Sequence, residues 1–198
     1  MWITNEHHAL LAKKAKVSLI ESATNLFSHY QRAITKSSHE FDVVMNDGTT
    51  RSMSVYKGHP VLIVNGASAW GNTDREFTQL QLLHYQYASR GVKFIVFPCN
   101  QFGSQAPLSS SEMRQFLAKY HYRGDLTVTC NVNGKHAHPL WSWMKEHKNG
   151  KGIISNDIKW NFTKFLLDQN GQVVCRVGPQ TEMRKLSKPI EKLLQGRK

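Results

Sequence analysis

Apolar and polar residues follow each other from residue 41 onward in patterns typical of short strands and amphipathic helices. Residues 61–65 and 92–97 are apolar runs, the pattern of central strands covered on both faces. Between them, residues 74–90 predict a helix, because apolar side chains recur there at helical spacing: Phe77, Leu80, Leu83 and Tyr87. The further predicted elements are a hairpin of strands 41–45 and 50–54, a helix beginning after Ser109, a strand 126–130, a helix 139–148, a closing hairpin of strands 162–167 and 172–177, and a terminal helix around 189–194.

A turn signal and a cap signal support these boundaries. Asn46-Asp47-Gly48 joins the first two strands, and its glycine supplies the positive φ that such a hairpin turn needs. Ser109 and Glu112 form a capping-box pattern at the start of a helix. Helices on both faces of a small mixed sheet predict an α/β fold. A chain of 198 residues forms one such domain and buries roughly 70% of its unfolded surface.

The first 38 residues have a different pattern from the rest. Apolar residues recur at a spacing of three to four and predict an amphipathic helix: Leu19, Ile20, Ala23, Leu26, Phe27, Tyr30 and Ile34. Lys and Arg outnumber Glu there, which makes the helix basic. Lys13-Lys14 interrupts the preceding apolar residues, so no secretory signal is expected. Residues 1–38 are either a mitochondrial transit peptide or a retained extension, ahead of a domain over residues 39–198.

The composition limits the chemical classes of partner that the chain is expected to bind. Lys and Arg number 26 against 14 Asp and Glu, and the net charge of +12 favours anionic partners such as lipid phosphate, glutathione carboxylates or nucleic acid. No RNA-binding signature accompanies this charge, so nucleic acid is not the expected partner. No apolar run approaches 18 residues, which excludes a transmembrane helix.

The cysteines indicate the compartment. Cys99, Cys130 and Cys175 are odd in number and lack CxxC spacing, which predicts inert free thiols in a reducing compartment, the cytoplasm or the mitochondrion. His136 and His138 are too isolated to indicate a metal. No metal and no prosthetic cofactor is therefore expected.

Three sequence blocks occur in a fixed order. Residues 97–103 read FPCNQFG, residues 138–145 read HPLWSWMK and residues 158–165 read IKWNFTKF. They resemble blocks of the glutathione peroxidases, above all the monomeric phospholipid-hydroperoxide type, and the resemblance runs from about His39 to Leu194. It implies a thioredoxin-like fold, a monomer, and reduction of hydrogen peroxide and lipid hydroperoxides in the oxidative-stress response. The implied reductant is glutathione or another thiol.

The resemblance also implies four site residues. In the family, a Cys or selenocysteine in an A-S-x-(C/U)-G turn acts with a Gln, a Trp and an Asn, and these positions fall on Trp70, Gln105, Trp160 and Asn161. The sequence of residues 61–73 reads as a strand, a tight turn and a helix start, where a helix N-terminus stabilises a thiolate or selenolate. An indole gains nothing there. The chain as written is therefore expected to be inactive.

Cationic residues are expected beside this site. By the resemblance, Lys145, Lys151, Lys159 and Arg176 border the active face, where they would hold lipid phosphate or glutathione carboxylates. Equally, they are surface charges that keep the protein soluble.

Two hypotheses account for Trp70. Selenocysteine is encoded by UGA and tryptophan by UGG, so one base change or a reinterpreted codon separates an active selenoenzyme from this sequence. The alternative is a pseudoperoxidase whose basic surface and N-terminal helix bind an anionic membrane surface or a larger assembly.

Overall fold

The computed structural model describes residues 10–11, 13–24, 37–152 and 154–196, and the chain forms two compact units, Met1–Lys36 and Ser37–Lys198. In the first unit, residues 10–11 and 13–24 are helical and exposed. The second half of the predicted amphipathic helix lies outside the described residues. The division between residues 38 and 39 stays a prediction. No helix in the described part of the chain is long and apolar enough to cross a membrane.

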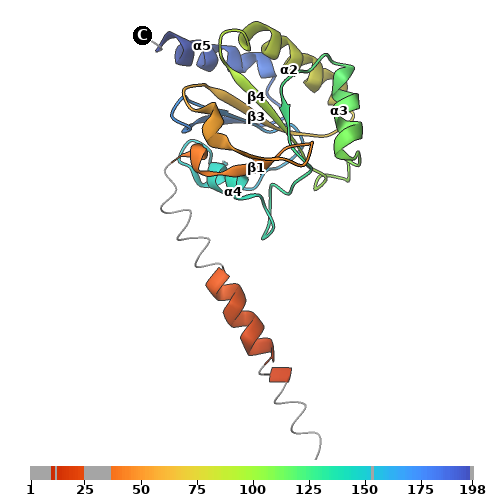
Figure 1. Ribbon diagram of the computed structural model, residues 1–198, viewed down its shortest axis with the longest axis vertical. Coiled ribbons are helices and arrows are strands. Elements are labelled where there is room, and N and C mark those ends of the chain that lie inside the picture. The colour runs from red at the N-terminus through yellow and green to blue at the C-terminus, as the bar shows by residue number, and fades with distance from the viewer. Residues whose placement is uncertain (1–9, 12, 25–36, 153, 197–198) are drawn as a thin grey trace, which may run out of the picture. The chain divides into compact units, whose positions relative to one another are not determined.

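The second unit is built on a five-stranded mixed sheet in the order β5-β4-β3-β6-β7 (Figure 1). Its strands are β3 (Val61–Gly66), β4 (Lys93–Pro98), β5 (Asp125–Leu126), β6 (Lys164–Leu167) and β7 (Val173–Val177). The two apolar runs pair in parallel, with Val61 opposite Lys93, while β6 runs antiparallel to β3, with Leu167 opposite Val61. A parallel centre with an antiparallel side is the mixed sheet that the pattern predicts.

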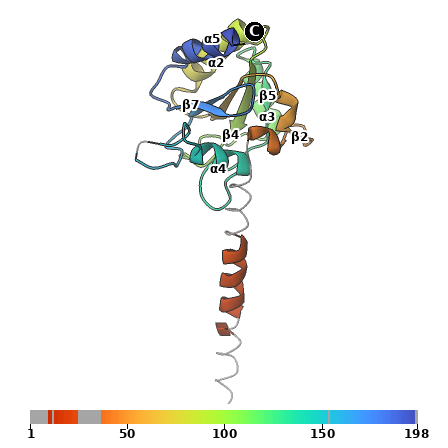
Figure 2. The ribbon, with the colours of Figure 1, turned by 90° about the vertical axis from the view of Figure 1, so that its left-hand side faces the viewer.

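Helices cover both faces of this sheet (Figure 2). The remaining elements are η1 (Ser38–Glu40), β1 (Asp42–Val44), β2 (Thr50–Ser52), η2 (Met53–Tyr56), α2 (Thr73–Tyr87), α3 (Ser110–Ala118), α4 (Pro139–Glu146), η3 (Met183–Leu186) and α5 (Ser187–Gln195). Leu62 and Val64 pack into the core under α2, α3 and α5, whereas Val61 and Ile63 pack toward α4 and the β1–β2 hairpin. This alternation along one strand gives the protein two apolar cores and confirms the α/β, thioredoxin-like fold.

Several local predictions are confirmed. Gly48 has φ +85° in the turn between β1 and β2. Ser109 caps α3, its hydroxyl accepting the backbone N–H of Glu112, whose carboxylate in turn accepts the Ser109 N–H. The helix expected over residues 74–90 is α2, and all four of its predicted core residues are buried.

Three predicted strands are too long. The strand expected over residues 50–54 is only Thr50–Ser52, because the 3-10 helix η2 begins at Met53. The strand expected over residues 126–130 is only Asp125–Leu126, because the regular pairing with β4 is interrupted: Thr127 and Cys130 N–H still donate to β4 carbonyls, but Val128 N–H donates to Val44 C=O of β1. The strand expected over residues 162–167 begins at Lys164, because Phe162 is left-handed at φ +55° and cannot continue a pleated strand.

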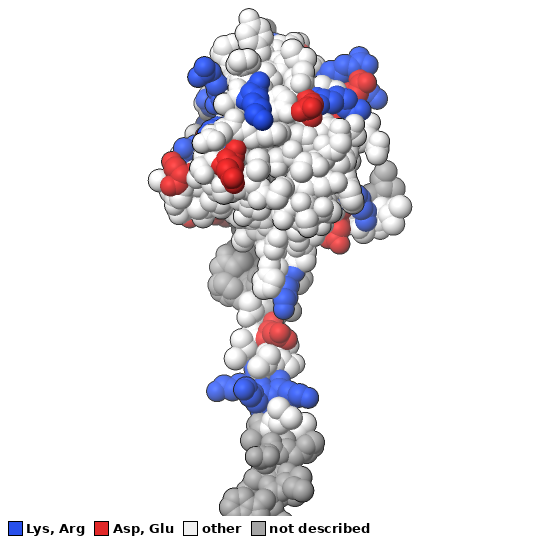
Figure 3. Space-filling view, turned by 90° about the vertical axis from the view of Figure 1, so that its right-hand side faces the viewer, with Lys and Arg blue, Asp and Glu red and all other residues white. Residues whose placement is uncertain are grey.

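The charge of this unit is dispersed on the face shown in Figure 3, where Lys and Arg stand among Asp and Glu on a mostly neutral surface. Within this unit, the Arg90 guanidinium makes a paired contact with the Glu191 carboxylate at 2.6 and 2.7 Å. The net charge of +12 therefore does not make this face a continuous basic surface.

Candidate functional site

The turn that carries Trp70 connects the end of β3 to the start of α2. Thr73, the first residue of α2, closes it: the Thr73 hydroxyl accepts the Trp70 backbone N–H at 3.1 Å and donates to Ala67 C=O at 2.9 Å. Asn72, the residue before the helix, makes no side-chain cap bond. The turn thus lies at the positive end of α2, and its backbone bonds do not involve the side chain of residue 70.

The Trp70 indole packs as an apolar group. It is partly buried and stacks on Phe162 with ring centroids 5.7 Å apart and planes 26° apart. Phe162 is fully buried and meets Phe77 of α2 edge-on at 5.0 Å. The indole has no ionised form at neutral pH and no sulfur or selenium to oxidise. The position that suits a reactive anion holds an aromatic ring.

Gln105 joins this turn to the segment that carries Asn161. Its backbone C=O accepts the N–H groups of Ser68 and Ala69 at 3.0 and 2.9 Å. Its side-chain Oε1 accepts Asn161 Nδ2 at 2.7 Å. The reversal that brings Gln105 here uses two consecutive left-handed residues, Gly103 and Ser104, at φ +60° and +54°. The structure therefore brings Trp70, Gln105 and Asn161 together.

Asn65, at the end of β3, holds the segment from Trp160 to Thr163. Its side-chain Oδ1 accepts Thr163 N–H at 2.8 Å and its Nδ2 donates to Trp160 C=O at 3.3 Å. Its backbone C=O accepts the N–H of left-handed Phe162 at 2.8 Å. The sequence reasoning missed this fully buried asparagine. A polar residue at the end of an apolar run was the signal that could have found it.

Asn161 and Trp160 present different surfaces. Asn161 is fully buried, and its Oδ1 accepts no hydrogen bond from the described residues. Trp160 is 39% exposed and packs against Phe102 at a centroid distance of 5.9 Å. One amide acceptor is thus left unused in the site, next to a large aromatic surface that solvent reaches.

None of the three cysteines has the lowered pKa of a reactive thiol. Burial raises the pKa of Cys99 and of Cys175, and it raises the pKa of Cys130 to about 12. All three remain protonated thiols at neutral pH, as expected of inert cysteines. No group of three His, Cys, Asp or Glu residues that could hold a metal ion occurs in the part of the chain that the structure describes.

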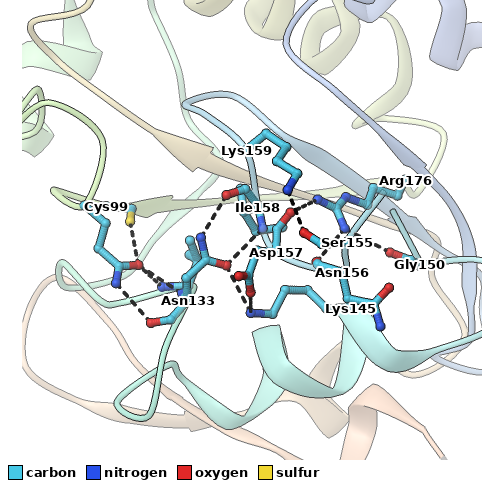
Figure 4. Close-up of polar contacts among 12 residues, drawn as sticks. Cys99, Asn133, Lys145, Gly150, Ser155, Asn156, Asp157, Ile158, Lys159 and Arg176 are labelled. Atoms are coloured by element: carbon cyan, nitrogen blue, oxygen red, sulfur yellow. Dashed lines mark hydrogen bonds and ion pairs between the residues drawn. The ribbon is translucent and has the colours of Figure 1, made fainter. Parts of the chain in front are cut away.

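Three of the four predicted cationic residues share one depression of about 280 Å³: Lys151, Lys159 and Arg176. The Arg176 guanidinium donates to the backbone carbonyls of Asn156 and Asp157, both at 2.7 Å (Figure 4). Lys151 and Lys159 are exposed. The depression therefore offers lysine ammonium groups to an anion, with Arg176 forming part of its wall.

Lys145 does not line this depression. It is 7% exposed, and its ammonium donates to Asn133 Oδ1 at 3.0 Å and lies 3.6 Å from Asp157 (Figure 4). Burial lowers the pKa of Lys145, an effect that Asp157 partly offsets. The Lys145 ammonium therefore contacts groups of the protein itself and does not face the depression.

Comparison with known proteins gives consistent matches. A family model described as Glutathione peroxidase matches residues 38–145. Phospholipid hydroperoxide glutathione peroxidase of Hylobates lar is 48% identical over 154 residues, which are 78% of this chain and 78% of that protein. The protein of the same name from Bos taurus is 48% identical over 147 residues, 74% of this chain and 75% of that protein. A crystal structure of T. cruzi GPX1 matches at 35% identity and a TM-score of 0.68, covering 82% of this chain and 99% of that one.

Proposed function

The chain belongs to the glutathione peroxidase family, and from this premise we propose that its site is built for thiol-dependent reduction of lipid hydroperoxides but lacks the nucleophile in the chain as written. The matched relatives are of the phospholipid-hydroperoxide type, which supports that substrate class. The presence of tryptophan at position 70 supports the proposed lack of activity.

The reaction needs a polarisable anion at position 70. A thiolate or selenolate attacks one peroxide oxygen, the O–O bond breaks, and the departing alkoxide takes a proton to become an alcohol. The attacking atom becomes a sulfenic or selenenic acid, which an external thiol then reduces with release of water. Trp70 can perform neither step. Gln105, Trp160 and Asn161 carry hydrogen-bond donors that suit the anion and the leaving oxygen, but none of them is a nucleophile.

The observation that carries this proposal is the bond from Asn161 Nδ2 to Gln105 Oε1, at 2.7 Å, beside the turn of Trp70. Gln105 bonds to that turn through its backbone as well. In this proposal, these amides are the polar partners of a nucleophile that residue 70 does not supply. A protein that used this surface only for packing would need no such arrangement of amides.

The reductant in this proposal is an external thiol such as glutathione. A second cysteine that could form a disulfide with residue 70 is not present on α3, which spans Ser110–Ala118. In this proposal, Lys151 and Lys159 bind the carboxylates of glutathione or a lipid phosphate in the depression whose wall includes Arg176. We further propose a monomer in the cytoplasm or the mitochondrion, and a UGA codon in the ancestry of position 70.

The test is turnover by purified full-length chain in which mass spectrometry shows Trp at position 70. With glutathione and a phospholipid hydroperoxide, its rate is expected to be lower than that of a nucleophile-bearing relative by roughly 10⁴-fold or more, as for other enzymes that lose a nucleophile. Turnover within tenfold of such a relative would contradict the proposal. Reading the codon at position 70 shows whether the tryptophan is encoded.

A second candidate function is binding to an anionic lipid surface without catalysis. The observation that favours it is the helix of residues 13–24, where Lys13, Lys14 and Lys16 accompany exposed Leu19 and Ile20. Cations beside inserting apolar side chains each contribute about 1 kcal/mol at an anionic membrane. Flotation with anionic and neutral liposomes tests it: a salt-sensitive preference for anionic vesicles that is lost on removal of residues 1–38 supports the candidate, and equal binding to both vesicles contradicts it.

A further inference from the structure

The two segments that carry Gln105 and Asn161 are connected a second time, away from the site. The connection consists of the hydrogen bonds of two side-chain amides, Gln101 and Asn133, and is called the relay below. We propose that Asn133 is a positioning residue that sets the conformation of residues 158–161 and so holds Trp160 and Asn161 in register with Gln105. This inference deepens the proposed function and rests on it for its meaning in catalysis.

The relay begins at Gln101, four residues before Gln105. Gln101 Oε1 accepts the backbone N–H groups of Val132 and Asn133 at 2.8 and 2.9 Å. Gln101 Nε2 donates to Asn133 C=O at 3.0 Å. These three bonds tie the backbone of Val132 and Asn133 to the segment that leads into the site.

The relay continues through the Asn133 side chain to Ile158 (Figure 4). Asn133 Oδ1 accepts Ile158 N–H at 2.9 Å, and Asn133 Nδ2 donates to Ile158 C=O at 2.8 Å. These are the two bonds that a neighbouring strand would make to the residue. Ile158 is 2% exposed, so water does not readily replace them.

Lys145 determines which way the Asn133 amide is oriented. Its ammonium donates to Asn133 Oδ1 at 3.0 Å, and the same oxygen accepts Ile158 N–H. A reversed amide would place its NH₂ group against both of these donors and its oxygen against Ile158 C=O. The nearly buried Lys145 therefore holds Asn133 in the single orientation that serves Ile158.

The segment depends on these contacts because it has no regular structure of its own. Within the described part of the chain, residues 154–160 belong to no helix or strand and make no backbone-to-backbone hydrogen bond. Side chains hold them instead: Asn133 binds Ile158, Arg176 binds the carbonyls of Asn156 and Asp157, and Asn65 binds the carbonyl of Trp160. Trp160 follows Ile158 by two residues, so a change at Ile158 is transmitted directly to the indole and to Asn161.

The relay and the bond from Asn161 to Gln105 connect the same two segments at two places. One connection runs from Gln101 through Asn133 to Ile158, and the other is the 2.7 Å bond from Asn161 to Gln105. The chain itself links Gln101 to Gln105 and Ile158 to Asn161. Loss of the Asn133 bonds leaves the Asn161–Gln105 bond and the packing of Trp160 on Phe102 as the contacts between the two segments, which is why Asn133 matters although it lies outside the site.

The experiment uses the full-length chain with ¹⁵N-labelled tryptophan, in which the indole N–H resonance of Trp160 is assigned by its loss in Trp160→Phe. Asn133→Ala is expected to shift or broaden this resonance more than that of buried Trp141. It is also expected to speed amide exchange across residues 159–162 by roughly tenfold or more. Asn131→Ala is the matched control: Asn131 is exposed, its side chain makes no hydrogen bond within the described residues, and no change is expected.

An unshifted Trp160 resonance in a folded Asn133→Ala protein overturns the inference, as does an equal shift at Trp141, which would indicate general loosening of the core. If Asn133→Ala does not fold, Lys145→Met decides. It keeps both bonds to Ile158, so a smaller shift of the same resonance is expected, and no shift overturns the inference. These readouts need no peroxidase activity. Failure of a cysteine at position 70 to react with hydroperoxide would contradict the proposed function while leaving this inference in place.

Discussion

The turn that carries Trp70 and the segment that carries Trp160 and Asn161 meet at one site, yet different contacts hold them. The turn is closed by backbone groups and by the Thr73 hydroxyl, without the side chain of residue 70. The segment is held by the amides of Asn65, Asn133 and Gln105 acting on its backbone and on Asn161. The conformation of the turn is fixed by backbone groups and one hydroxyl, whereas the conformation of the segment is fixed by side chains from other parts of the chain.

Under the proposed function, the site lacks its nucleophile but keeps its shape, and this difference in contacts is consistent with that. Exchange of the side chain at position 70 breaks none of the hydrogen bonds that form the turn, and the indole gains a stack on Phe162 in return. Exchange of Asn65 or Gln105 would leave buried or paired amide and backbone groups without partners, which is costly. Loss at position 70 is therefore tolerated by the fold, whereas loss in the segment is not.

The largest expected effect is the reactivity of a thiol placed in the turn. In Trp70→Cys, the N-terminus of α2 should lower the pKa of the new thiol, whereas burial raises the pKa of Cys130 to about 12. At pH 7 the thiolate fractions then differ by roughly four orders of magnitude. Iodoacetamide should alkylate the new thiol at position 70 and leave Cys130 intact, as read by peptide mass spectrometry. Equal labelling of the two sites would show that the turn does not stabilise an anion.

The second-largest expected effect is on the free energy of unfolding, to which the two regions should contribute differently. Phe162→Ala removes a fully buried ring that contacts Trp70 and Phe77, and is expected to lower the free energy of unfolding by about 3–5 kcal/mol. Trp70→Ala removes a partly buried ring from the turn and should cost about 1 kcal/mol. Urea denaturation of both variants measures the difference. A larger loss for Trp70→Ala would mean that the indole has become part of the core.

A smaller effect is expected from removal of a polar partner. In the Trp70→Cys protein, Gln105→Ala should slow reaction of the thiol with hydroperoxide by about 10²-fold, because an amide near the reacting atoms and the partner of Asn161 are both lost. Asn131→Ala in the same background serves as the control and should leave the rate unchanged. A Gln105→Ala rate equal to the control would remove Gln105 from the site.

Much of the fold could be predicted from the sequence because its signals are local. The apolar runs became β3 and β4, and the Ser109–Glu112 capping pattern became the start of α3. The strand lengths at residues 126 and 162 could not be predicted in this way. They depend on a bond from Val128 to distant Val44 and on the left-handed backbone of Phe162, both of which follow from tertiary contacts.

In the candidate site, too, the features that depend on tertiary contacts could not be predicted from the sequence. The resemblance indicated Gln105, Trp160 and Asn161 as site residues, but it did not indicate the asparagines that bind the segment of Trp160 and Asn161, because Asn65 and Asn133 act on backbone groups far along the chain. Lys145 was expected beside the active face, and the structure buries it with Asn133 and Asp157. A lysine on a helix normally extends to solvent, and only a partner from another segment identifies the exception.

A single turnover by purified Trp70→Cys protein with one equivalent of phosphatidylcholine hydroperoxide tests whether the site lacks only its nucleophile. We expect one equivalent of the lipid alcohol and addition of one oxygen to the sulfur at position 70, followed by its removal on addition of glutathione. The parent chain with Trp70, treated alike, should leave the hydroperoxide intact. A folded Trp70→Cys protein that also leaves the hydroperoxide intact would contradict the claim that the nucleophile is what this site lacks.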